Sequence, residues 1–253
     1  MVGIAPRLGE TWIRGLSLLG FFVVWQLTAV IVAQPLLPAP TVVMASLWSH
    51  MMDGGLLYHL GVTLARVTVS FVIAMAVGAG IGIFMGRSTR VDGALDGVLV
   101  LGLNIPALVT IFLCYIWFGL TEAAAVTAVA LNKIPTVVVT VREGARAVDP
   151  KLMDVARVYR VGPLRTLTRV YLPQLYPYLM AAARSGLALI WKIVLVVELL
   201  GRSNGVGFQI GTYFQFFDIT SILAYTLAFA GVILFIEAGA VRPLERRFSR
   251  WRQ

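Results

Sequence analysis

Long apolar runs alternate with short polar stretches along almost the whole chain. A membrane-spanning helix requires about 20 predominantly apolar residues, and six runs meet this requirement. We predict spans at Gly15 to Ala33, Leu64 to Gly86, Val98 to Phe118, Ala123 to Val141, Pro177 to Leu200 and Ser221 to Val241. The first run is longer than the apolar core of a secretory signal peptide, so we expect it to remain as an anchor helix. The pattern therefore predicts an all-α polytopic membrane protein.

Composition supports this interpretation. Of the 253 residues, 59% are hydrophobic and 13% are charged, whereas an average soluble domain is about 25% charged. So few charges cannot cover the outside of a water-soluble fold of this size, which argues against a soluble enzyme. The single cysteine, Cys114, lies in an apolar run and is interpreted as a packing residue. His50 and His59 lie in a polar stretch without other metal-ligating side chains, and we interpret both as surface residues.

Basic residues next to the predicted spans gather on one side of the membrane. That side holds Arg7, Arg14, Arg87, Arg90, Arg142, Arg146, Lys151, Arg157, Arg160, Arg165, Arg169, Arg242, Arg246, Arg247, Arg250 and Arg252. The other side holds Arg66 and Arg202. Because cytoplasmic flanks are enriched in Lys and Arg, both termini are predicted to be cytoplasmic, which requires an even number of spans. The net charge of +9 is then explained by topology and contact with anionic lipid headgroups, without a nucleic acid partner.

The segment between the fourth and fifth spans, residues 142–174, is too polar to cross a membrane and too long for a simple turn. Asp149-Pro150 is typical of a helix start, since Asp caps the first turn and Pro fits within it. Leu152, Val155, Ala156 and Tyr159 then recur at helical spacing. Gly162-Pro163 is expected to end this helix and open a second one, which Leu172-Pro173 ends. Such an element fits either an amphipathic loop lying on lipid or a docking element for a soluble partner.

The sequence from Glu143 to Pro173 resembles the cytoplasmic EAA loop of ABC-importer permeases. In that loop a Glu-Ala-Ala triplet is followed by a glycine and later by Leu-Pro. Alignment on Leu172-Pro173 places Asp154 to Ala156 on the triplet and Arg160 where the family has its glycine. Either Gly162 takes over the turn or the docking contact differs in detail. The resemblance implies that Asp154, Ala156, Arg157, Arg160, Gly162, Leu172 and Pro173 couple the chain to an ATPase.

Shorter motifs resemble the nitrate, sulfonate and taurine branch of these permeases. They are Asn104-Ile-Pro106, Trp117-Phe-Gly119, Val148-Asp-Pro150, Val197-Glu-Leu-Leu-Gly201, Asn204-Gly-Val-Gly207 and Leu244-Glu-Arg-Arg. The resemblance covers roughly Thr63 to the C-terminus and implies a type I ABC-importer permease (MetI-like) fold. It implies an N-terminal anchor and extracytoplasmic connection at residues 1–62, a transmembrane domain at 63–245 and a basic tail at 246–253. The implied solutes are alkanesulfonates, taurine, nitrate, bicarbonate and vitamin precursors.

The chain lacks a nucleotide site of its own. A phosphate-binding P-loop requires a Gly-Lys pair, which is absent from the sequence. Gly78, Gly82 and Gly86 recur every four residues within a span, a spacing that favours close helix packing. We therefore expect no enzyme activity, cofactor or metal in this chain. The resemblance implies two ATPase subunits carrying ATP and Mg, docked on the 150–162 helices, an extracytoplasmic substrate-binding protein and a second permease copy in a prokaryotic plasma (inner) membrane. Whether that second permease is identical stays open.

Polar and helix-breaking residues within spans are candidates for a translocation path. A charge at the bilayer centre costs about 2.5–3.5 kcal/mol and therefore tends to face protein or water. Asn104 with Pro106, and Asn132 with Pro135, are expected to break or soften the third and fourth spans. The path is predicted to include Asn104, Pro106, Asn132, Lys192 and Glu198, with Lys192 beside a passing anion and Glu198 near the outer gate.

Two of these path residues also have a purely structural interpretation. Lys192 and Glu198 also fit a structural role, in which each is paired between helices or snorkels to an interface. Lys133 and Glu237 are interpreted as structural. Trp117 and Trp191 are interpreted as interfacial or packing aromatics.

Three other functions compete with an importer permease. A self-contained secondary transporter would show internal symmetry and central acidic coupling residues. A membrane-embedded enzyme would need a nucleophile and base, or a metal cluster, within the spans. A structural membrane protein is the third. The transported solute stays open, because solute choice in such importers is set largely by the binding protein.

Overall fold

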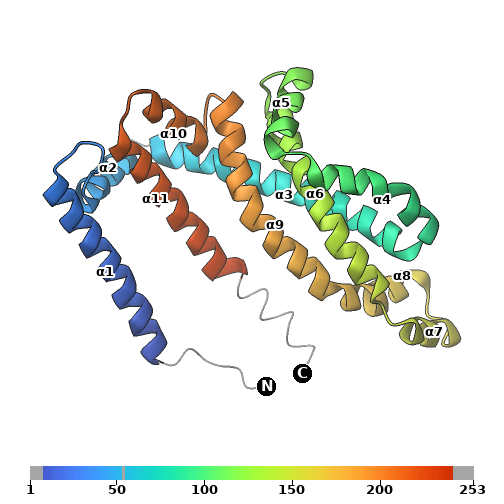
Figure 1. Ribbon diagram of the computed structural model, residues 1–253. Coiled ribbons are helices and arrows are strands. Elements are labelled where there is room, and N and C mark those ends of the chain that lie inside the picture. Colours follow the sequence, from blue (N-terminus) through green and yellow to red (C-terminus); the bar gives the residue numbers. More distant parts are fainter. Residues whose placement is uncertain (1–7, 53–54, 242–253) are drawn as a thin grey trace.

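The computed structural model describes residues 8–52 and 55–241, which form helices joined by short turns (Figure 1). The elements are α1 (Leu8–Val32), α2 (Pro40–Met52), α3 (Gly55–Arg87), α4 (Thr89–Asn104), α5 (Ala107–Phe118), α6 (Glu122–Arg146), α7 (Pro150–Val158), α8 (Pro163–Thr166), the π-helical turn η1 (Leu167–Tyr171), α9 (Leu172–Gly201), α10 (Val206–Gln215), α11 (Ile219–Ile236) and the π-helical turn η2 (Glu237–Val241). The described ranges contain no strand. The all-α prediction is confirmed.

Five helical segments are long and apolar enough to cross a membrane, namely Gly15–Val32, Gly55–Arg87, Glu122–Arg146, Pro163–Gly201 and Ile219–Gly239. The sixth predicted span, Val98 to Phe118, is not one straight helix. It is the pair α4 and α5, which meet at an angle of 98°. The described part of the chain therefore holds five candidate spans, and a sixth if the bent α4–α5 pair, called here the broken span, crosses the membrane.

Two prolines within spans have opposite effects on their helices. Pro106 ends α4, because Ile105 before it is extended (φ −71°, ψ 123°) and the chain turns into α5. Pro135, by contrast, lies inside the continuous helix α6. A Cβ on Gly102 of α4 would lie 3.0 Å from Cγ of Pro135, so the proline ring fits only because Gly102 has no side chain. The fourth span is therefore not broken near Asn132 and Pro135, whereas the predicted break near Asn104 and Pro106 is confirmed.

The fifth span also differs from its prediction. Leu172-Pro173 does not end a helix, since Pro163–Gly201 is one continuous helical segment. Its π-helical turn ends with the N–H of Leu172 bonded to the carbonyl of Leu167. Pro173 follows directly within the first turn of α9, where the missing N–H is tolerated. The second helix of the 142–174 segment and the fifth span are therefore continuous.

α3 and α6 share the most extensive helix contact, and glycine makes it possible. A Cβ on Gly78 would lie 2.7 Å from Cβ of Val137, and one on Gly82 would lie 2.8 Å from the carbonyl oxygen of Val138. A Cβ on Gly86 would lie 2.5 Å from that of Ala145. The prediction that these glycines serve close packing is confirmed, and this Gly78–Gly82–Gly86 seam fixes the two helices together.

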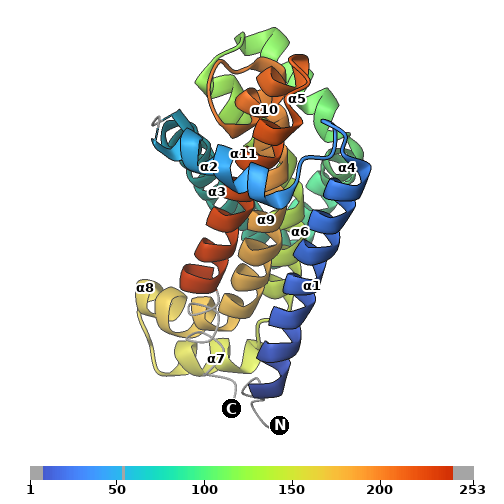
Figure 2. The same ribbon diagram turned by 90° about the vertical axis from the view of Figure 1, so that its left-hand side faces the viewer.

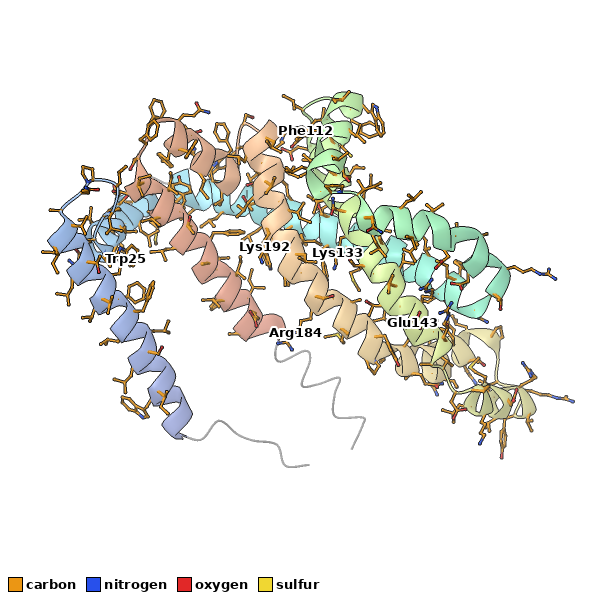
Figure 3. All side chains as sticks on the ribbon, viewed as in Figure 1. Trp25, Phe112, Lys133, Glu143, Arg184 and Lys192 are labelled. Atoms are coloured by element: carbon orange, nitrogen blue, oxygen red, sulfur yellow. The ribbon has the colours of Figure 1, made fainter. Side chains whose placement is uncertain are left out.

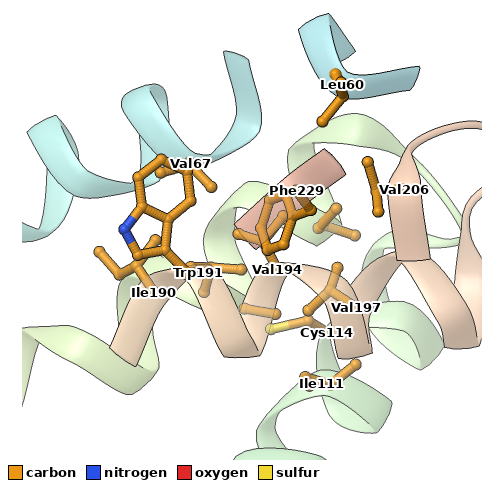
Figure 4. Close-up of a cluster of buried hydrophobic side chains, with 14 of the residues drawn as sticks. Leu60, Val67, Ile111, Cys114, Ile190, Trp191, Val194, Val197, Val206 and Phe229 are labelled. Atoms are coloured by element: carbon orange, nitrogen blue, oxygen red, sulfur yellow. The ribbon is translucent and has the colours of Figure 1, made fainter. Parts of the chain in front are cut away.

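The main apolar core lies where α3, α5, α6, α9 and α11 meet (Figure 4). Cys114 is 1% exposed within it, as expected of a packing residue. Trp191 packs edge-on against Phe229, with ring centroids 5.8 Å apart. These contacts place α9 and α11 against the α3–α6 pair.

Different helices lie at the two ends of the molecule. α7 and α8 lie at one end, called here the α7 end, where α1 begins and α11 finishes (Figure 2). α2 and α10 lie at the opposite end, called here the Arg66 end. α1 stands apart from the bundle and contacts mainly α2 (Figure 1). The predicted boundary between residues 62 and 63 falls inside α3, and the predicted basic tail, 246–253, lies outside the described residues.

Adding one methyl group to the seam tests its packing. Gly82→Ala places a Cβ where backbone and Val141 already stand, and overpacking of this kind costs about 1–3 kcal/mol. We expect the apparent melting temperature of the purified protein to fall by about 2–8 °C. Gly80→Ala is the matched control, because nothing lies within 4 Å of a Cβ at Gly80 in the same helix. Equal effects of the two substitutions would contradict the seam.

Candidate functional site

The helix α7 forms as its sequence predicts. Asp149 is its N-cap, with the side chain accepting a hydrogen bond from the Lys151 backbone N–H at 2.8 Å, and Pro150 follows in the first turn. The backbone N–H of Asp149 donates to the Gln174 side chain at 2.9 Å. This bond ties the start of α7 to the start of α9.

The turn after α7 is made by Arg160. Its φ is +49°, in the left-handed region that costs most residues roughly 1–2 kcal/mol. Gly162 has an ordinary φ of −60°. Of the two alternatives above, Gly162 therefore does not take over the turn. Arg160 adopts a glycine-like backbone at the position where the EAA pattern has glycine.

One face of α7 is buried and the other is open. Ala156 is 4% exposed against the protein, whereas Val158 and Tyr159 are each 78% exposed. Leu152 and Val155 are also exposed, and Asp154 pairs with Arg157 at 2.9 Å on the same outer surface. Leu172 and Pro173 lie at the start of α9, where Leu172 is half-buried and Pro173 is exposed. α7 thus presents an apolar surface edged by charges.

Ion pairs fix the helices that carry α7. Arg142 contacts Asp96 at 2.7 Å and Arg146 contacts Asp92 at 2.5 Å, which joins the end of α6 to the start of α4. Glu143, labelled in Figure 3, lies between these arginines on α6 and accepts from both. The end of α6, which precedes α7, is therefore bonded to α4 of the broken span.

A second charged cluster closes the Arg66 end. The Arg66 guanidinium donates to Glu198 at 2.8 Å and to Glu122 at 2.6 Å, which links α3, α9 and α6. Arg202 donates to the same Glu122 carboxylate at 2.5 Å. Arg66 is 4% exposed and Glu198 is 0% exposed. Buried charges are tolerated when they are paired and hydrogen-bonded in this way.

The loop before α10 wraps around Glu198. The carboxylate accepts from the Thr63 hydroxyl and the Gly207 N–H, each at 2.9 Å. Gly205 has a φ of +108°, and a Cβ there would collide with the Glu198 carboxylate. Glu198 is thus paired between helices, which agrees with the structural one of its two interpretations.

The histidines are not surface residues, which corrects the prediction. His59 accepts a hydrogen bond from the Gly205 N–H at 2.9 Å, and His50 is bonded to the Ser221 hydroxyl at 3.0 Å. Both rings are half-buried between helices at the Arg66 end. Both lie near helix ends in a polar part of the sequence, and the sequence pattern does not reveal the groups to which they bond.

The structure divides the predicted path residues among three places. Asn132 lines a largely apolar pocket of about 410 Å³ between α3, α4, α5 and α6, beside the break marked by Asn104 and Pro106. Lys192 lines another pocket, of about 290 Å³, between α9 and α11. Glu198 lies in the charged cluster and lines neither. The path residues therefore do not form one continuous surface within a single chain.

Sequence reasoning missed the partners of Glu198. Arg66 and Arg202 were counted only as orienting charges, and Thr63 and Glu122 were not singled out. The available signal was that Arg66 lies within an apolar run together with Thr63, three residues earlier. A charge within such a run requires a partner, and another span had to provide it.

The sequence matches the family model "binding-protein-dependent transport system inner membrane component" over residues 78–249. The chain belongs to this family. A putative aliphatic sulfonates transport permease protein, SsuC, from Bacillus subtilis (strain 168) is 31% identical, with 95% of this chain and 88% of the relative aligned. The taurine transport system permease protein TauC from Escherichia coli (strain K12) is 28% identical, with 90% and 84% aligned.

Solved structures of low sequence identity share the fold of this permease. A chain of the MetNI methionine ABC transporter in an inward-facing conformation matches with a TM-score of 0.67 and 17% identity, covering 79% of this chain and 98% of that one. An amino acid ABC transporter with histidines matches with a TM-score of 0.61 and 20% identity, covering 79% and 97%. The predicted importer-permease fold is confirmed. Family membership also confirms a multi-pass transport subunit rather than an enzyme.

The backbone of the permease at Arg160 gives a direct test. Arg160→Gly removes the left-handed penalty of roughly 1–2 kcal/mol, offset in part by the about 0.5–1 kcal/mol entropic cost of glycine. We expect the melting temperature to rise by about 1–4 °C. Arg160→Ala is the control and does not raise it, because alanine keeps the Cβ that the left-handed backbone at this position disfavours. A lower melting temperature for Arg160→Gly would refute the assignment.

The charged cluster of the permease gives a second test. Arg66→Met leaves Glu198 buried without a cation, which costs about 3–5 kcal/mol. Glu198→Met costs less, because Arg66 keeps Glu122. Thermal unfolding of both single variants and of the double variant forms a mutant cycle. We expect the double variant to be more stable than the sum predicts, and strict additivity would argue against the pair.

Proposed function

We propose that this chain is the membrane-spanning subunit of an ATP-powered importer for a small anion or related solute in a prokaryotic plasma membrane. Candidate solutes are sulfonates, taurine, nitrate, bicarbonate and vitamin precursors. An extracytoplasmic binding protein delivers the solute at the Arg66 end, and separate ATPase subunits bind at the α7 end. Two permease copies, surrounded by lipid, enclose the path. ATP and Mg belong to the ATPase subunits.

The open apolar face of α7 is the observation that carries this proposal. Val155, Val158 and Tyr159 are exposed outside the spans on a helix whose opposite face is anchored. Either lipid or a groove on a protein could cover such a face, and the match of residues 143–173 to the EAA loop, in a chain of the binding-protein-dependent transport family, favours the groove. A short helix with an exposed apolar face fits a groove on a soluble partner. The docking interpretation of residues 142–174 is therefore favoured.

The mechanism follows from how α7 is held. ATP-driven closure of the ATPase subunits moves the α7 helices as rigid levers. The ion pairs of Arg142 and Arg146 with Asp92 and Asp96 transmit that motion to the broken span. At the other end, the Glu198 cluster holds the outer side closed until the conformation changes. Asn104, Pro106, Asn132 and Lys192 line the path between the two ends.

Charge reversal on α7 tests the docking. Asp154 is exposed and bonded only to its helix neighbour Arg157, so Asp154→Lys leaves the fold intact. We expect at least tenfold less ATPase to copurify with the chain and a parallel loss of solute uptake. Arg90→Glu, an exposed charge reversal at the start of α4, is the control and keeps both. Normal assembly and uptake by Asp154→Lys would overturn the docking role.

A further inference from the structure

The charges within the spans are sorted by depth. A helix rises about 1.5 Å per residue, so Lys192 lies about 14 Å below Gly201, the last residue of α9. Lys133 lies about 16 Å below Glu122, the first residue of α6. The bond between Glu122 and Arg202 sets these two helix ends at one level. Since the hydrocarbon core is about 30 Å thick, both lysines lie close to its middle.

Carboxylates avoid this middle layer. Among the described residues, Glu122 and Glu198 lie at the Arg66 end and are paired there. Asp92, Asp96 and Glu143 lie at the α7 end and are paired with arginines. Glu237 follows 18 residues of α11, which places it about 27 Å from the Arg66 end. The middle of the described spans therefore holds the two lysines, and Glu237 is a carboxylate that lines the same pocket as Lys192.

Lys133 is a basic residue enclosed by the protein. It is 2% exposed, and in the described part of the chain no carboxylate lies within ion-pair distance of it. A Cβ on Gly186 would lie 2.9 Å from Cε of Lys133, so the lysine chain crosses α9 where that helix has no side chain. A buried, unpaired ammonium is costly unless a negative charge visits its surroundings. This is the opposite of what a purely structural role requires.

Lys192 faces the pocket between α9 and α11, where Figure 3 places it on the same helix as Arg184. Apolar side chains form most of the walls, including Trp191, Leu195, Phe229 and Ile233. Arg184 and Glu237 also line it, and each has an interaction of its own. The volume of about 290 Å³ lies near the lower limit of about 300 Å³ for small-molecule sites.

The other two pockets are less suited to an anion. The pocket beside Asn132 has no charged lining residue. The pocket of about 650 Å³ near α10 contains Arg202, but that guanidinium is already bonded to Glu122 and to the Leu120 carbonyl. Only the α9–α11 pocket, of these three, offers an ammonium with no carboxylate bonded to it within the described ranges.

We infer that the pocket between α9 and α11 binds the transported anion midway through the membrane, with Lys192 contacting its charged group and the apolar wall contacting a short hydrocarbon chain. Lys133 adds positive potential at the same depth from the neighbouring helix. This inference rests on the proposed function and specifies its solute as a small organic monoanion. It reassigns Lys133 from a structural residue to one that supports binding.

Ethanesulfonate is the probe for the test. Its binding to the complex of full-length chain and ATPase, in nanodiscs of neutral lipid, is measured by calorimetry. Lys192→Gln is expected to raise Kd at least tenfold, Lys192→Arg less than threefold, and Lys133→Met about two- to fivefold. Arg90→Gln removes an exposed charge in the first turn of α4, at the α7 end, and leaves Kd unchanged. Butanesulfonate should bind more tightly than ethanesulfonate, by about fourfold for each added methylene that is buried.

The outcomes separate this inference from the proposed function. Unchanged affinity in Lys192→Gln, an equal loss in Arg90→Gln, or no binding of ethanesulfonate by the unmodified complex would each overturn the anion site. In all three cases ATPase copurification and ATP hydrolysis would still support the importer. Failure of the unmodified chain to assemble with an ATPase would instead overturn the proposed function itself.

Discussion

The close contact between α3 and α6 is the constraint on which the rest of the structure depends. Three glycines one helical turn apart let the two backbones approach until a single added Cβ would collide with the partner helix. Between helices in lipid, such packing replaces the hydrophobic driving force that water provides elsewhere. The pair is therefore a rigid body, and α9 adds to it through the apolar core and the Arg66–Glu198 pair.

Because the α3–α6 pair is rigid, its two ends move together. α6 carries Glu122 at the Arg66 end and Arg142 with Arg146 at the other, just before α7. A displacement of α7 therefore cannot be absorbed within α6 and must appear at the broken span or at the Glu198 cluster. The 98° bend between α4 and α5 is one of these places. In the proposed importer, these two places are where the path opens and closes.

The sequence predicted those features that a single segment determines. Five spans follow from their apolar content, and the α7 start follows from Asp149 and Pro150. Features that depend on a second helix were missed. Pro106 and Pro135 look alike in sequence, yet only Pro135 faces a glycine that makes room for its ring. α3 begins at Gly55 rather than Leu64, and in this added part Thr63 bonds to Glu198 of α9 and His59 to Gly205 of the α9–α10 loop, contacts that local hydropathy does not reveal.

In the proposed importer, the distribution of charge across the membrane suggests that the sign of the solute charge and the identity of the solute are selected at different places. At the Arg66 end the charges of Arg66 and Arg202 are balanced by Glu122 and Glu198, and at the α7 end Arg142 and Arg146 face three carboxylates. Among the described residues no carboxylate pairs with Lys133 or Lys192, although Glu237 lines the Lys192 pocket, and a charge at this depth acts strongly because the surrounding dielectric is low. In the proposed importer such a field would select the sign of a solute but distinguish poorly among small anions of one charge, so finer selection would occur before the solute enters the membrane.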